Sequence, residues 1–174
     1  MKKLSIIILF LLNTNFVLAN NIAVIDIETI ISKNIEFTKF IENLTKSQIE
    51  YEQKLNQEEK TLKDELINIE NEKLILSEKE LLNKIEKYNS DLEIFKKKVN
   101  KFNNHYQNEI LANRNYIIQQ IIILLENYAK KNNISVIFDA TNYILAADSI
   151  NLTNEIEEGL NKINLELRFN NFEN

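Results

Sequence analysis

The sequence predicts a mainly α-helical protein with a small β body, in which a long antiparallel helical hairpin stands on a short-stranded base. Two observations predict this fold class. An apolar heptad pattern runs through the middle of the chain, which has no proline and whose only glycine is Gly159. Two short runs rich in β-branched residues flank that pattern, at residues 21–27 and 134–139. A hairpin is the arrangement that brings these two runs together.

The N-terminus has the pattern of a secretory signal peptide. Lys2 and Lys3 give a positive start, an apolar run of about nine residues follows, and the stretch up to Ala19 supplies small or β-branched residues. A bilayer-spanning anchor needs about 20 apolar residues, so we expect cleavage near Ala19. The predicted segments are a signal peptide at 1–19, a base formed by 20–29 and 132–165, a hairpin at 30–131 and a tail at 166–174.

The composition excludes several kinds of chemistry. One glycine is too few for a loop that cradles phosphate, and without cysteine, and with His105 as the one histidine, the usual zinc sites cannot be built. A catalytic triad would have to use His105, which lies in a charged helical stretch. We therefore expect no enzyme, no cofactor and no metal site. The chain has 26 acidic and 21 basic residues, a net charge of −5, and we expect no nucleic-acid partner.

Both halves of the middle region carry a heptad seam. In the second half the apolar positions alternate in steps of four and three, at Leu81, Ile85, Tyr88, Leu92, Phe95, Val99, Phe102 and Tyr106. In the first half the seam is formed by Ile41, Leu44, Tyr51, Leu55, Leu62, Ile69 and Leu76. Gln48 and Glu58 interrupt that first seam, which makes the first arm the weaker one.

A capping box predicts where the chain turns back. Ser77 and Glu80 have the spacing in which each side chain caps the other residue's amide at a helix start. Ser90 and Glu93 have the same spacing by chance, but Ser77 is close to midway between the two β-like runs. The arms 30–76 and 77–131 would each be about 70–80 Å long. Their net charges of −3 and +3 favour antiparallel pairing.

The base is predicted from the two β-like runs. The candidate contact residues of an oligomer base are Val24, Ile25, Val136, Ile137 and Phe138. One pair of short strands is marginally stable, so further strands or other subunits must complete the sheet. Residues 142–147 are a candidate third strand, and Thr153 is predicted to cap a last helix. A base this small predicts oligomerisation.

Three segments together resemble a known family. They are "IAVIDIETII" at the start, "LSEKELLNKIEKYNSDLEIFKKKVNKF" at the turn and return of the hairpin, and "ISVIFDATNYILAADSINLTNEIEEGL" at the end. With the signal peptide before them, they are similar to the Skp (OmpH-like) family of periplasmic chaperones over about residues 22–165. Asn151, Leu152 and Thr153 stand where that family has an Asp-Ile-Thr helix start.

The resemblance implies a homotrimer in the periplasm with a jellyfish-like architecture, in which three hairpins project around a cavity. It implies an ATP-independent holdase that keeps unfolded outer-membrane β-barrel proteins from aggregating on their way to the outer membrane. Many family members are basic, whereas this chain is acidic, and only Lys96, Lys97, Lys98 and Lys101 form a basic cluster. That cluster is either a solvated flank of the coiled coil or a contact for clients, a membrane surface or lipopolysaccharide.

Two other functions remain open at this point. A membrane-anchored structural stalk would keep a full-length anchor and form one unbroken rod. A periplasmic coiled-coil adaptor would share the hairpin but would bind one folded partner instead of unfolded chains. No role is assigned to the tail.

Overall fold

The computed structural model describes residues 22–173, and the predicted signal peptide lies outside them. The chain divides into two compact units. The first comprises residues up to Ile30 together with 120–163, and the second comprises 31–119 together with 164–174. Helix α2 (Ile27–Lys33) and helix α4 (Glu78–Asn132) each run from one unit into the other.

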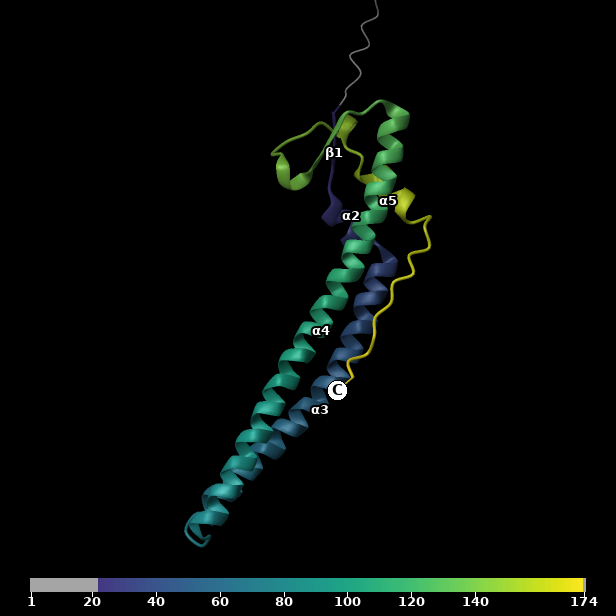
Figure 1. The fold of residues 1–174 in the computed structure, drawn as a ribbon. Helices are drawn as coiled ribbons and strands as arrows, with labels where there is room; N and C mark the ends of the chain where they lie inside the picture. The colour runs from purple at the N-terminus through teal and green to yellow at the C-terminus, as the bar shows by residue number, and fades with distance from the viewer. Residues whose placement is uncertain (1–21, 174) are drawn as a thin grey trace, which may run out of the picture. The chain divides into compact units, whose positions relative to one another are not determined.

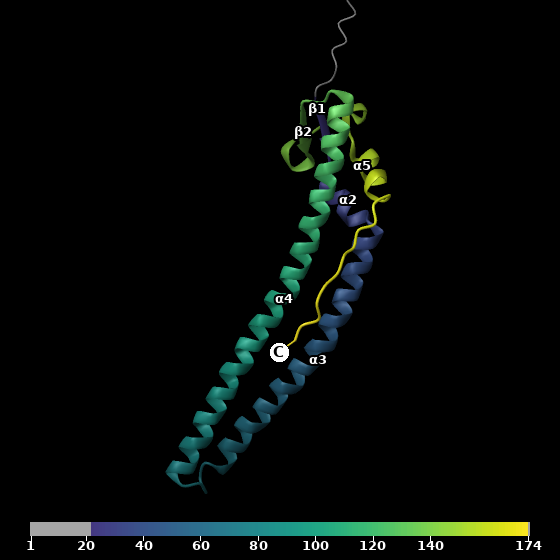
Figure 2. The ribbon, with the colours of Figure 1, turned by 45° about the vertical axis from the view of Figure 1, so that its right-hand side comes forward.

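The second unit is an antiparallel helical hairpin. Helix α3 (Ile35–Glu72) and the part of α4 that belongs to this unit, residues 78–119, lie side by side in both ribbon views (Figures 1 and 2). Asn34 caps α3 by accepting a hydrogen bond from the amide of Phe37 at 2.9 Å. The core between the helices contains four predicted heptad positions, Leu44, Leu55, Phe102 and Tyr106. Its fifth residue is Phe40 instead of the predicted Ile41, which is only partly buried. The helical hairpin predicted from the heptad pattern is confirmed.

The first unit contains a two-stranded parallel sheet. Strand β1 (Ile22–Ile25) pairs with β2 (Val136–Asp139), with Ile22 opposite Val136 and Ile25 opposite Asp139. On its other side β1 forms a single bridge from Val24 to Asn151. Helix α5 (Thr153–Leu160) and the end of α4 complete this unit, whose buried side chains include Ala23, Val24, Ile25, Ile121, Leu125, Ile156 and Leu160. The small β body of the prediction is confirmed.

A left-handed residue reverses the chain between α4 and β2. Asn133 has φ of 54°, and the amide of Ile134 donates to the carbonyl of Ala129 at 3.0 Å. This is the Schellman arrangement that satisfies carbonyls at a helix end. Because the chain turns sharply there, β2 can return alongside β1 in the same direction.

Two local predictions for the first unit are wrong. Residues 142–147 form no strand; Asn142 ends the 3₁₀ turn η1 (Ala140–Asn142), and residues 143–147 lead to a second 3₁₀ turn, η2 (Asp148–Ile150). Ile144 and Leu145 are 105% and 89% exposed. These residues favour a strand, but no strand among residues 22–173 lies against them, so the propensity alone does not produce one. Thr153 is the first residue of α5 and not its cap; the cap position is Leu152, which makes no side-chain cap bond.

Candidate functional site

The turn of the hairpin lies between Glu72 and Glu78. The amide of Ser77 donates to Oε2 of Glu80 at 3.1 Å, and the amide of Glu80 donates to Oγ of Ser77 at 3.4 Å. Hydrogen bonds from the Ser77 hydroxyl and amide lower the pKa of the Glu80 carboxyl. Next to this cap the turn exposes two apolar side chains, Leu74 at 93% and Ile75 at 82%.

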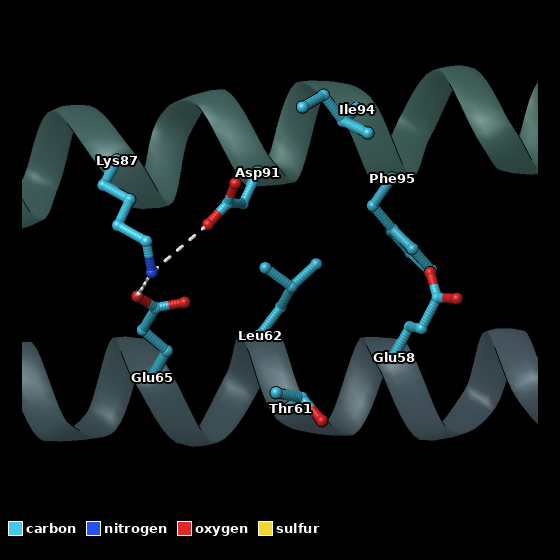
Figure 3. Close-up of a pocket in the computed structure, with 8 residues that line it drawn as sticks. All are labelled: Glu58, Thr61, Leu62, Glu65, Lys87, Asp91, Ile94 and Phe95. Atoms are coloured by element: carbon cyan, nitrogen blue, oxygen red, sulfur yellow. Dashed lines mark hydrogen bonds and ion pairs between the residues drawn. The ribbon is translucent and has the colours of Figure 1, made fainter.

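Ion pairs link the two arms in the half of the hairpin that is nearer the turn. Lys87 on α4 lies 3.3 Å from Oε1 of Glu65 on α3 and 3.6 Å from Asp91 on its own helix (Figure 3). Leu62 points into the space between the helices beside this group, where a hollow of about 360 Å³ opens (Figure 3). The seam here is thus half open to solvent and combines apolar and charged side chains.

The structure distributes the four clustered lysines over different environments. Lys98 binds Glu58 of the other arm at 2.8 Å, so the carboxylate that interrupts the first seam is paired. Lys96 binds Glu93 on its own helix at 3.0 Å. Lys97, Lys98 and Lys101 line a hollow of about 290 Å³ together with Ile94 and Phe172. Within residues 22–173, Lys97 and Lys101 form no ion pair with another side chain.

The tail covers an apolar groove between the two arms, in the half of the hairpin that is farther from the turn at residues 72–78. Residues 164–173, which are called the tail from here on and begin two residues before the predicted tail, run alongside the two helices in both views (Figures 1 and 2). The ring of Phe172 packs edge-on against Tyr51 and Phe102, with centroids 4.7 and 5.7 Å away, and Phe169 packs edge-on against Phe40 at 6.0 Å. We call this surface the tail groove; besides those rings, Phe37 and Ile110 pack against the same cluster.

The predicted base residues divide between a buried strand and an exposed one. Val24 and Ile25 on β1 are buried within their own unit. On β2, Val136 and Phe138 are each 43% exposed and Ile137 is half-buried. A pair of four-residue strands is therefore left with an apolar outer surface.

Three polar side chains tie the elements of the first unit together. Thr153 accepts a hydrogen bond from the amide of Asp26 at 2.9 Å and donates one to Asn151 at 2.7 Å. Asp139 accepts from the amide of Ile27 at 3.2 Å. Burial raises the pKa of Asp139, but hydrogen bonds from Thr141 and from the amides of residues 27 and 140 outweigh it and hold the pKa below its usual value.

Neither a metal cluster nor a membrane span was found in the part of the chain that the structure describes. Residues 22–173 contain no group of three or more His, Cys, Asp or Glu side chains placed to hold an ion. No helix in the same range is long and apolar enough to cross a bilayer.

Fold and site together define a class of protein with two units: a helical hairpin with open, mixed apolar and charged grooves, and a unit with two short strands whose outer apolar surface is uncovered. The model of the outer membrane protein (OmpH-like) family matches residues 21–160, and the chain belongs to that family. A solved structure of a candidate outer membrane chaperone (OmpH-like) from Caulobacter crescentus CB15 is similar in fold. Its TM-score is 0.68 at 14% identity, over 87% of this chain and 89% of that chain. A search of curated proteins found no match.

The residues that hold the tail were not predicted from the sequence. They are Glu36 on the first arm and His105, Glu109 and Asn113 on the second, and each binds the tail's backbone. A weak signal was available, because the tail alternates apolar and polar residues in "LELRFN". The groove side chains themselves carry no such signal, since polar residues on a long charged helix are expected at every turn.

Proposed function

We propose that the chain is a non-catalytic, ATP-independent holdase chaperone of the periplasm. It binds unfolded outer-membrane β-barrel proteins as a homotrimer and keeps them from aggregating. The observation that carries this proposal is the family match over residues 21–160 of a hairpin with open apolar grooves. The periplasmic location rests on the N-terminal signal-peptide pattern.

The open grooves supply the kind of contact that a holdase needs. Apolar side chains are exposed along both arms and around the turn, at Ile49, Leu66, Ile67, Leu74, Ile75, Leu82, Ile94 and Leu111. They are interleaved with charges of both signs, which keeps any one contact with an unfolded chain weak. Many weak contacts hold a client's strands away from one another and still allow release.

The lysine-lined hollow adds a charge preference to these contacts. Lys97 and Lys101 have no acidic partner among the described side chains, and Ile94 supplies an apolar wall beside them. We propose that this hollow takes acidic side chains of the client. Replacing both lysines by glutamine would then weaken binding of an acidic client and make binding less sensitive to salt. If the same change instead abolished binding to anionic lipid vesicles only, the hollow would belong to a membrane surface.

The trimer is proposed from the exposed surface of the base. Two short strands need further partners for stability, and the side chains of Val136 and Phe138 leave β2 with an apolar face uncovered. Three copies arranged around one axis would cover that face in each chain. Val136→Glu with Phe138→Glu should yield a monomer, whereas Lys162→Glu, an exposed change in the same unit, should keep the native mass.

One experiment tests the function directly. The chain from residue 20 onward is purified, its native mass is measured, and a urea-unfolded outer-membrane β-barrel protein is diluted into it while light scattering is followed. We expect a three-chain mass and suppressed scattering. A monomer that leaves scattering unchanged would contradict the proposal and favour the adaptor function.

A further inference from the structure

The hairpin holds the tail by its backbone. The amide of Leu165 donates to Glu36 at 2.8 Å, and the amide of Arg168 donates to Oδ1 of Asn113 at 3.2 Å. The same Asn113 returns a hydrogen bond from Nδ2 to the carbonyl of Arg168 at 2.9 Å.

Two further side chains hold the next stretch of tail backbone. The carbonyl of Asn170 accepts from Nε2 of His105 at 2.7 Å, and its amide donates to Glu109 at 3.3 Å. All of these bonds reach peptide groups, which every sequence offers. Two other bonds reach tail side chains: Glu109 accepts from Nδ2 of Asn170 at 3.4 Å, and Ser47 donates to Oδ1 of Asn171 at 2.8 Å. The polar half of the tail groove therefore recognises an extended chain mainly by its backbone.

The apolar half of the tail groove selects a two-residue period. Leu165 is buried, and Leu167 and Phe169 are half-buried against the hairpin. The residues between them, Glu166 and Arg168, point to solvent and pair with each other at 3.0 Å. An extended segment places alternate side chains on opposite sides, so from Leu165 to Phe169 every second position meets the groove. Two features depart from this period: the amide of Leu167 donates to the carbonyl of Leu165 at 2.7 Å in a tight turn, and the anchoring ring of Phe172 follows Phe169 by three residues.

We propose that the tail groove is a binding site for extended segments of unfolded chains in which every second residue is apolar, and that the tail is its displaceable internal occupant. This combination of backbone hydrogen bonds with pockets for alternate side chains is a general mode of recognising extended peptides. The inference rests on the proposed function, and it names the segment that the site takes. The tail itself lies beyond the residues matched by the family model.

The tail is suited to be displaced. Its outward side chains are exposed, and its two aromatic rings are only half-buried. Because it is tethered, it competes at an effective concentration on the order of millimolar, so a short segment displaces it poorly and a long one displaces it well. Beyond Phe172 the groove continues into the lysine-lined hollow, which gives a longer client chain further surface to occupy.

A reversible lock tests this inference in the full chain. The Ser47 hydroxyl lies 2.8 Å from Oδ1 of Asn171, and the chain has no cysteine, so Ser47→Cys with Asn171→Cys introduces one possible disulfide. The probe is a fluorescent peptide with the sequence of residues 163–173, and binding is measured by anisotropy with the protein oxidised and then reduced. Asn171→Cys alone is the matched control.

We expect the oxidised double variant to bind the probe at least tenfold more weakly than the reduced form, with no such change in the control. A peptide of the same composition with its apolar residues consecutive should bind at least tenfold more weakly than the probe. Equal affinity in both redox states, equal affinity for both peptides, or no binding to the reduced protein even at concentrations on the order of millimolar would each overturn the inference.

A second variant acts in the opposite direction and needs no disulfide. Phe172→Ala removes a tail anchor and should tighten probe binding several-fold, whereas the exposed neighbouring change Glu173→Ala should not. Unchanged probe affinity in Phe172→Ala would count against the tail as an occupant. Light scattering by an unfolded β-barrel protein distinguishes the failure of one proposal from the failure of the other. If the chain binds the probe but does not suppress aggregation, the chaperone function alone is refuted. If the double variant suppresses aggregation equally in both redox states, the tail-groove assignment alone is refuted.

Discussion

The hydroxyl of Thr153 makes a direct test of how the first unit is held together. It lies in a 7% exposed side chain and joins the end of β1 to the start of α5, accepting from the amide of Asp26 at 2.9 Å and donating to Asn151 at 2.7 Å. Thr153→Val keeps the shape of the side chain and removes both hydrogen bonds. Each bond contributes about 1 kcal/mol net, and leaving the amide unpaired adds to the loss.

We therefore expect Thr153→Val to lower the free energy of unfolding by about 2 kcal/mol. With a urea dependence of about 2 kcal/mol per molar, the unfolding midpoint falls by about 1 M. The assay is urea unfolding followed by circular dichroism at one fixed protein concentration, because association changes apparent stability. Thr141→Val is the matched control, since that hydroxyl also donates to a side-chain oxygen two residues away, that of Asp139, but lies at an exposed residue.

The control should move the midpoint by less than about a third of that amount, because exposed hydrogen bonds are readily replaced by water. If Thr153→Val unfolds at the parent's midpoint, the hydroxyl does not tie the two elements together. Equal losses in both variants would show that burial at Thr153 has no bearing on the cost.

Three further predictions follow from local geometry. Asn133→Gly should be neutral or slightly stabilising in urea unfolding, while Asn133→Val should cost about 1–2 kcal/mol because φ is 54° there; equal stability of the two would contradict this account. The pKa of Asp139 lies below its ordinary value of 3.8, so its carboxylate stabilises the fold above that pH and the stabilisation is lost as pH falls through the lowered pKa. Asp139→Asn should thus have a lower free energy of unfolding than the parent at pH 7 and approach the parent's value below about pH 4. A difference in unfolding free energy that does not change with pH would refute this. Ser77→Ala should raise the hydrogen-exchange rate of the first-turn amides of α4 several-fold without a change at the α4 end near Asn132. An unchanged exchange rate in the first turn would show that the Ser77 cap does not stabilise the start of α4.

The hairpin could be predicted from the sequence because its signal is local and repeated. Heptad positions such as Leu55 and Phe102 recur over many turns, and both are buried in the core of the second unit. The pairing of the two β-like runs followed from the reversal between them. Their parallel direction depends on the left-handed turn at Asn133, and one asparagine in an asparagine-rich chain carries little information.

The rest depended on contacts between distant residues. Residues 142–147 have strand propensity, but propensity cannot say whether a neighbouring strand exists, and Ile144 and Leu145 are left exposed. Thr153 was expected to bond within its own helix, whereas its hydroxyl accepts from Asp26 across the unit. The tail groove could not be predicted, because His105 and Asn113 look like any solvated positions of a charged helix until the tail lies against them.

The parallel pairing of β1 with β2 sets the order in which the chain can fold. The hydrogen bond from Ile27 to Asp139 spans 112 residues, so the sheet is among the most non-local contacts in the chain and carries a large loop-closure entropy. Zippering of the helices from the turn at Ser77 needs only neighbours along the chain and removes most of that entropy before the strands meet. Strand β1 therefore stays unpaired until residues 136–139 have been synthesised. We expect the pairing of the two strands in the first unit to be a late and comparatively slow step of folding.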